Sequence, residues 1–153
     1  MNIVENLKNH QIELEDASTP AGNYVPYIIT NKLIFISGQL PFKQGKIPIT
    51  GIVGETVSSE DAIEMAKLCA LALISQLKSA CDGDLNNVSR VVKLGGFVAS
   101  ASSFTSQPTI INGASDIMVK AFGEQGKHSR FAVGVSSLPL NAPVEIEGIF
   151  ELK

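Results

Sequence analysis

Two carboxylates and one arginine near the end of the chain are the residues best suited to do chemistry. In residues 144–150, Glu145 and Glu147 alternate with apolar side chains, which is typical of a strand with one buried face. Arg130 lies in an earlier strand-like run and alternates with apolar residues in the same way. If both apolar sets face the core, Arg130, Glu145 and Glu147 share the opposite face of a sheet. A guanidinium there could hold a carboxylate through two parallel hydrogen bonds, and a glutamate could deprotonate a water.

The same charges also fit a purely structural interpretation. A salt bridge between an arginine and a glutamate on an exposed sheet contributes at most about 1 kcal/mol, and the charge pattern by itself favours this interpretation. On the arginine's face, however, the small residues Ala132, Gly134 and Ser136 would leave room for a ligand or a neighbouring subunit. The pattern alone leaves both interpretations open.

The elements that must position these side chains follow from capping residues and apolar periodicity. Ser58, with Asp61 three residues later, predicts the start of a long helix, and Pro108 predicts the first residue of another. Asn31 and Lys32 predict a two-residue hairpin turn. The predicted order is a helix at 2–9, strands at 27–30 and 33–37, a helix from 58 that ends before 82, a strand at 88–100, a helix at 108–122, and strands at 130–136 and 144–152. This order predicts an α+β fold, a mixed β-sheet with two helices packed on one face.

Length and composition narrow the functional classes. The 153 residues predict a single domain, 1–153, in which residues 1–19 form an N-terminal extension. Charged residues make up only 18% and the mean hydropathy is +0.20, so another subunit is expected to cover part of the surface. Leu68 and Leu71 fall on the outer side of the long helix, which is therefore expected to lack a fully solvated face. The net charge of −3 argues against a nucleic-acid partner.

Location and metal binding are predicted from a few residues. No segment is apolar over the length that a membrane crossing needs. Cys69 and Cys81 lie too far apart along a helix for a disulfide, and free thiols predict a cytoplasmic protein. His10 and His128 are far apart, so no metal site is expected. His128 is interpreted as a solvated loop residue, although its place two residues before Arg130 would also allow it to lie at the mouth of a cleft.

Short motifs in a fixed order resemble a known family. They are residues 22–25 (GNYV), 36–41 (ISGQLP), Arg130 with Val133 and Val135, Leu138-Pro139, and residues 143–147 (PVEIE). From about residue 20 to the C-terminus, the chain resembles the YjgF/Rid family of reactive intermediate deaminases, also described as endoribonuclease L-PSP-like proteins. The resemblance implies a chorismate-mutase-like (YjgF-type) fold. It also implies a homotrimer whose sheets pack into a central barrel, with a ligand cleft at each subunit interface.

The resemblance also implies a reaction and a set of site residues. The reaction is hydrolysis of small 2-imino or enamine acids to a 2-keto acid and ammonia, with no metal and no organic cofactor. Arg130 and Glu145 stand at the catalytic positions, fifteen residues apart as in the family. The substrate-binding positions are Tyr24, Ser37, Gly38 and Asn112. Small imino or keto acids are the expected partners, and membranes and nucleic acid are not.

Two departures indicate a divergent branch of the family. Ala132 stands where deaminating members carry a cysteine, so no thiol can act there. The segment from Ala99 to Thr105 and the N-terminal extension are longer than in the typical deaminase; the hydroxyls of the former could line the cleft or belong to a helix-capping loop. Two further functions therefore stay open beside the deaminase: a non-catalytic trimer that binds small carboxylic acids, and an endoribonuclease.

Overall fold

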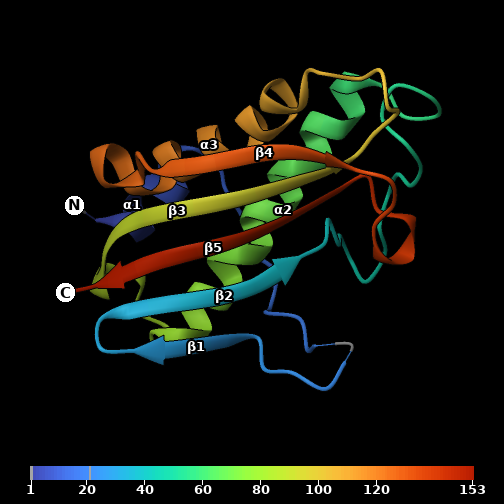
Figure 1. Cartoon of the computed structure of the whole chain (residues 1–153). Coiled ribbons are helices and arrows are strands. Elements are labelled where there is room, and N and C mark those ends of the chain that lie inside the picture. Colours follow the sequence, from blue (N-terminus) through green and yellow to red (C-terminus); the bar gives the residue numbers. More distant parts are fainter. Residues whose placement is uncertain (1, 21) are drawn as a thin grey trace.

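The computed structural model describes residues 2–20 and 22–153; Met1, the first residue of the expected extension, and Ala21 lie outside them. A mixed five-stranded sheet has the order β1-β2-β5-β3-β4, and the helices lie on one of its faces (Figure 1). The elements are α1 (Ile3–Asn9), β1 (Tyr27–Thr30), β2 (Leu33–Gln39), α2 (Ser59–Ala80), η1 (Leu85–Asn87), β3 (Val88–Ala99), α3 (Gln107–Phe122), η2 (Gly123–Gly126), β4 (Ser129–Val135), η3 (Pro139–Asn141) and β5 (Val144–Leu152). The predicted elements are therefore present, with boundaries that differ by one or two residues.

Local chemistry explains where these elements begin and turn. The Ser58 hydroxyl accepts a hydrogen bond from the backbone N–H of Asp61 at 3.1 Å, which caps the first turn of α2. Asn31 adopts a φ of 53° between β1 and β2, a left-handed conformation that asparagine tolerates. At the end of α3, Gly123 has a φ of 59° and stops the helix.

Strand pairing determines which residues can meet at a site. β1, β2, β5 and β3 pair with one another in antiparallel fashion, whereas β4 pairs in parallel with β3 at the sheet edge. The connection from β3 to β4 runs through α3, as a parallel pair requires. α2 and α3 pack closely because position 113 has no side chain: a Cβ there would lie 2.6 Å from the carbonyl oxygen of Ile63. The core between sheet and helices includes the fully buried Leu73, Ile111 and Phe150.

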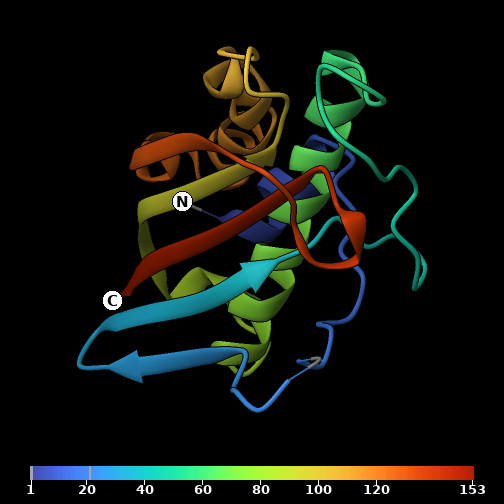
Figure 2. The same cartoon turned by 45° about the vertical axis from the view of Figure 1, so that its right-hand side comes forward.

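The N-terminal extension covers the outer side of α2. α1 packs against α3 and η1, and a hydrogen bond from the Asn6 amide to the carbonyl of Ala121 joins it to α3. Residues 10–20 then run along α2 (Figure 2), where Ser75 donates to the carbonyl of Glu15 at 2.7 Å. Leu68 and Leu71 are partly buried beneath this segment. The helices α2 and α3 pack on the sheet as expected, and the helix predicted at 2–9 is α1. The chain itself covers the outer side of α2. None of the helices in the described chain is long and apolar enough to span a membrane.

Candidate functional site

Glu145 is placed by β5 against an irregularity in β2. The pairing of β2 with β5 shifts register between Ile36 and Gln39, which brings the backbone of Gly38 against the Glu145 carboxylate. A Cβ at position 38 would overlap with Oε1 of Glu145, so only glycine leaves room for this carboxylate. The Ser37 hydroxyl donates to the carbonyl of Val25 at 2.9 Å, and this bond ties the segment before β1 to the same place.

A cavity of about 360 Å³ opens beside this carboxylate. Tyr24, Gly38 and Glu145 line it together with apolar side chains, among them Pro26 and Leu140. The structure therefore brings together four of the predicted site residues: Tyr24, Gly38 and Glu145 at the cavity, and Ser37 next to it with its hydroxyl bonded to the backbone.

The electrostatic setting of Glu145 favours its protonated form. Burial raises the pKa of Glu145, and the nearby charge of Glu147 raises it further. A carboxylate with a raised pKa is a stronger base toward a bound water near neutral pH. The cavity thus holds one half-buried group that suits proton transfer.

Replacing Glu145 with glutamine is expected to stabilise the fold at pH 7. Because the folded chain holds this proton more tightly than the unfolded chain, stability falls as pH rises from the unfolded pKa through the folded one, and glutamine escapes that loss. Glu145 is partly exposed, so solvent screening limits the gain to about 1 kcal/mol, or about 3 °C in Tm. Thermal unfolding between pH 3 and pH 8 measures it, with Glu13→Gln in the exposed extension as control. A gain that is equal at all pH values would contradict the electrostatic cause.

Arg130 lies in a different part of the molecule. Its Nη1 donates to the Ser115 hydroxyl and its Nη2 to the carbonyl of Pro108, both at 3.0 Å and both on α3. Asn112 is exposed on α3, one turn from Pro108 and one turn from Ser115, and so lies on the same side of that helix. The ion pairs within the described chain, Lys67–Glu64 and Lys127–Glu124, do not include Arg130. Its guanidinium is held by neutral groups and keeps N–H donors for an anion.

The expectation that Arg130 shares a sheet face with Glu145 and Glu147 is wrong. The alternation along β4 is as predicted, but its polarity is reversed: Arg130 faces α3, and Phe131 lies on the open face, edge-on to Phe97 at 5.3 Å between ring centroids. A Cβ at Gly95 would touch both Phe131 and Glu147, which confirms that these two share the open face. β4 is an edge strand, so its apolar side chains are not forced toward the helices.

Strand register shows how far the two groups lie from each other. Arg130 pairs with Leu94 and Glu145 pairs with Phe97 on β3, with one strand spacing on each side. Three residues along the strand and two strand spacings put the two Cα atoms roughly 14 Å apart in the plane of the sheet. Their side chains leave on opposite faces. Within one chain, the predicted site is therefore divided between a Glu145 part and an Arg130 part.

Ser115 lies beside Arg130, which the sequence did not reveal, and it also contacts His128. Ser115 Oγ lies 2.9 Å from Nε2 of His128, and Nδ1 of His128 lies 2.6 Å from the carbonyl oxygen of Gly126. His128 is half-buried, which corrects its interpretation as a solvated loop residue. The spacing of two residues between His128 and Arg130, which places both on one side of an extended chain, had indicated the alternative position beside Arg130.

Residues 100–104, within the long segment after β3, line a polar hollow near the start of α3. Ser100 and Ser102 line it together with Gln107, Gly134 and Ser136. The Gln107 amide, at the start of α3, donates to the carbonyl of Phe104 at 2.8 Å, whereas the N-cap residue Ser106 forms no side-chain capping hydrogen bond. This hollow shares no lining residue with the cavity at Glu145, so both interpretations of the segment, a wall of the cleft and a capping loop, stay predictions.

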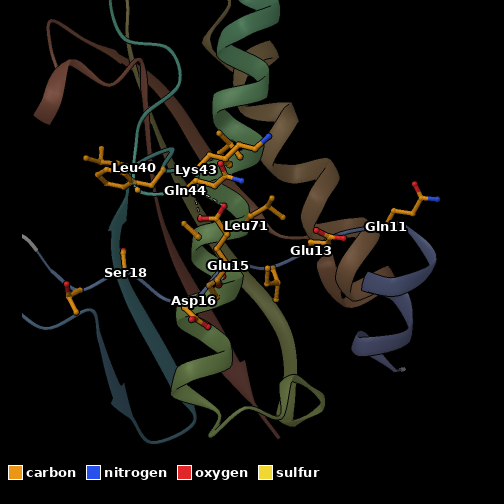
Figure 3. Close-up of a pocket in the computed structure, with 16 residues that line it drawn as sticks. Gln11, Glu13, Glu15, Asp16, Ser18, Leu40, Lys43, Gln44 and Leu71 are labelled. Atoms are coloured by element: carbon orange, nitrogen blue, oxygen red, sulfur yellow. Dashed lines mark hydrogen bonds between the residues drawn. The ribbon is translucent and has the colours of Figure 1, made fainter.

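A larger cavity, of about 710 Å³, lies between the N-terminal extension, the loop after β2 and α2 (Figure 3). Leu71 of α2 contributes to its apolar floor, and Glu13 and Asp16 belong to its rim. The Glu15 carboxylate accepts from the backbone N–H of Gln44 at 3.1 Å. This cavity shares residues 18, 19, 40 and 42 with the one at Glu145, so the two are adjacent. No group of three or more His, Cys, Asp or Glu side chains in residues 2–20 and 22–153 could hold a metal ion.

Comparison with known proteins shows which family the chain belongs to. The sequence model of the family described as "YjgF/chorismate mutase-like, putative endoribonuclease" matches residues 5–151. The chain belongs to the YjgF family. Protein TCP17 of Trypanosoma cruzi is 42% identical over 151 residues, which are 98% of this chain and 94% of TCP17.

Solved structures agree with the membership in the YjgF family. The crystal structure of Atu1372 from Agrobacterium tumefaciens has a TM-score of 0.92 at 46% identity and covers 99% of this chain and 92% of that one. A structure from Shewanella oneidensis, described as a putative endoribonuclease, has a TM-score of 0.95 at 32% identity. The match covers 99% of this chain and 100% of that one. The expected YjgF-type, chorismate-mutase-like fold is confirmed.

Proposed function

We propose that this YjgF family protein is a hydrolytic deaminase of small 2-imino acids, and that its active site forms between two copies of the chain in a homotrimer. The division of the predicted site within one chain carries the proposal. In a 2-imino acid the carboxylate is bonded directly to the imine carbon, so the group that holds the carboxylate and the group that activates water must lie a few ångströms apart. Arg130 and Glu145 of one chain cannot do this, whereas residues of two adjoining chains can.

The open face of the sheet supports association into such an assembly. Ile28 is 56%, Phe35 41% and Val133 42% exposed. Ile28 pairs with Phe35, and Phe35 with Ile149, so these side chains share the face that carries Glu147. Val133 pairs with Phe97, and Phe97 with Glu145, so Val133 lies on the same face. Exposed apolar side chains on one face of a folded domain indicate a contact surface, and three sheets packed through this face would form the expected central barrel.

The chemistry needs few groups. Arg130 of one chain would take the substrate carboxylate on the N–H groups that Ser115 and Pro108 leave free. Glu145 of the next chain would accept a proton from a water as the water oxygen bonds to the imine carbon. The same carboxyl group would return that proton to nitrogen, which gives a carbinolamine. The proton of the new hydroxyl group would then pass through the same carboxylate to nitrogen as the carbon–nitrogen bond breaks, so that ammonia leaves and the carbon keeps the oxygen as a ketone. The reaction consumes one imine and one water and yields one 2-keto acid and one ammonia.

An assay that generates the substrate in place tests the activity. An amino-acid oxidase produces 2-iminopropanoate from alanine, and the decay of the imine is followed with and without the purified protein. Accelerated decay that depends on Arg130 and Glu145 is expected. A thermal shift with 2-keto acids but no acceleration would instead identify a binding protein. If the wild type cleaves RNA, the double variant Arg130→Ala, Glu145→Ala does not, and neither accelerates imine decay, the protein is an endoribonuclease. Either of these two results would overturn the deaminase proposal.

The trimer is expected to depend on the open sheet face. Light scattering at micromolar concentration should give three times the chain mass of 16.2 kDa. Phe35→Glu places a charge within the apolar face and should shift the mass toward that of the monomer. Val4→Glu changes another exposed apolar residue, on α1 and away from the sheet, and should leave the trimer intact. A monomeric wild-type protein would contradict the proposed site.

A further inference from the structure

Arg130 is the end of a hydrogen-bonded chain of side chains. The Gly126 carbonyl oxygen lies 2.6 Å from Nδ1 of His128, whose Nε2 lies 2.9 Å from Ser115 Oγ, and Ser115 Oγ accepts from Nη1 of Arg130 at 3.0 Å. The participants come from η2, the segment before β4, α3 and β4. Arg130 is thus fixed on one side by a hydroxyl that is itself fixed by an imidazole.

The chemistry of the partners determines the protons in this chain. A carbonyl oxygen can only accept, so Nδ1 of His128 carries a proton. In neutral His128, Nε2 is then an acceptor, and the Ser115 hydroxyl donates to it while its oxygen accepts from Arg130. In protonated His128, Nε2–H would donate to the same oxygen. Two cations would then share one hydroxyl oxygen, an arrangement that a nearby anion would favour.

We propose that Ser115 and His128 are positioning residues for an anion site at Arg130, and that an anion bound there draws a proton onto His128. This inference rests on the proposed role of Arg130 as the anchor of the substrate carboxylate, and it names the residues that couple that role to pH.

The charges around His128 also favour its neutral form when no anion is bound. Burial lowers the pKa of His128, the hydrogen bond to Gly126 partly opposes this, and the charge of Arg130 lowers the pKa further. A bound carboxylate would offset the charge of Arg130 and let the pKa of His128 rise. By linkage, anions should then bind more tightly as the pH falls and His128 becomes protonated.

Other ionisable groups lie on the elements that pack around His128. α3 carries Asp116 and Lys120, and β3 carries Lys93. η2 and its C-cap carry Glu124 and Lys127, which pair with each other at 2.9 Å. Within the described chain, Arg130 differs from these groups because it shares a hydrogen-bond partner, the Ser115 hydroxyl, with His128. It is therefore the residue to change when the coupling is tested.

NMR titration of the two histidines tests the network without any turnover. Exposed His10, at the end of α1, is an internal control. Arg130→Gln should raise the pKa of His128 and leave that of His10 unchanged. Saturation of the wild type with pyruvate, a stable 2-keto acid, should also raise the pKa of His128 alone. Unchanged His128 titration in Arg130→Gln would overturn the network.

Pyruvate affinity tests the functional part by calorimetry. The wild type should bind pyruvate several-fold more tightly at pH 5.5 than at pH 7.5, and His128→Gln should remove this difference. Ser115→Ala should weaken binding by about threefold to tenfold, and Ser115→Thr, which keeps the hydroxyl, should restore it. If pyruvate binding depends on Arg130 but not on pH, and does not change the pKa of His128, the coupling to His128 is overturned while the anion site at Arg130 stands. Absence of any pyruvate binding would remove the anion anchor, and the proposed function with it.

Discussion

Replacing Arg130 with alanine is expected to lower kcat/KM for 2-iminopropanoate by about 100-fold or more. The lost contact is a charge-assisted pair of hydrogen bonds to the substrate carboxylate, each contributing about 1.5–3 kcal/mol, and 1.36 kcal/mol corresponds to a factor of ten. The oxidase-coupled imine assay measures the change, and circular dichroism shows whether the variant folds. Lys8 is exposed on α1, so Lys8→Ala is a control for the loss of a positive charge away from the sheet and should keep full activity.

Arg130→Lys separates charge from geometry. A lysine keeps the positive charge but has no planar fork, so it should recover only part of the activity and remain about tenfold below the wild type. Ser115 and Pro108 also hold the guanidinium in its orientation, and an ammonium cannot bond both at once with the same geometry. Full activity of either variant at Arg130 would exclude this residue as the carboxylate anchor.

Replacing Glu145 with glutamine is expected to lower kcat by about 100-fold to 1,000-fold, with a much smaller effect on KM. Glutamine keeps the size of the side chain against Gly38 but cannot accept a proton from water, and general base catalysis contributes about 10²–10⁴-fold. Glu147 lies two residues further along β5 and is exposed, so Glu147→Gln controls for the loss of a negative charge on the same face. A wild-type kcat for Glu145→Gln would exclude it as the base.

A mixture of the two inactive variants tests whether the site is shared between chains. When Arg130→Ala and Glu145→Gln chains are co-expressed, some interfaces join an intact Arg130 to an intact Glu145. In randomly mixed trimers about a quarter of the sites would carry both residues, so about a quarter of the wild-type activity should return. Each variant purified alone stays inactive. A mixture that remains inactive, although mixed trimers are present, would place both residues in one chain's site.

The strands and helices could be predicted because their signals are local. Ser58 caps α2 and Asn31 turns the first hairpin through bonds and backbone angles that involve only near neighbours. Glu145 and Gly38 could be assigned to one site only through the family resemblance, because their contact depends on the register shift between β2 and β5. Nothing in the spacing of two distant segments reveals such a shift.

The sequence by itself determined the order of elements, the YjgF family, and the alternation of side chains along β4 and β5. Only the tertiary structure decided which face of β4 meets α3. Alternation defines two faces of a strand but does not say which one is buried, and an edge strand is free to expose its apolar side. That choice turned Arg130 toward Ser115 and His128 and away from Glu145. In the proposed function, two chains would therefore have to complete the site. The same choice links the arginine, through Ser115, to His128, for which the sequence had left both a solvated loop and the mouth of a cleft open.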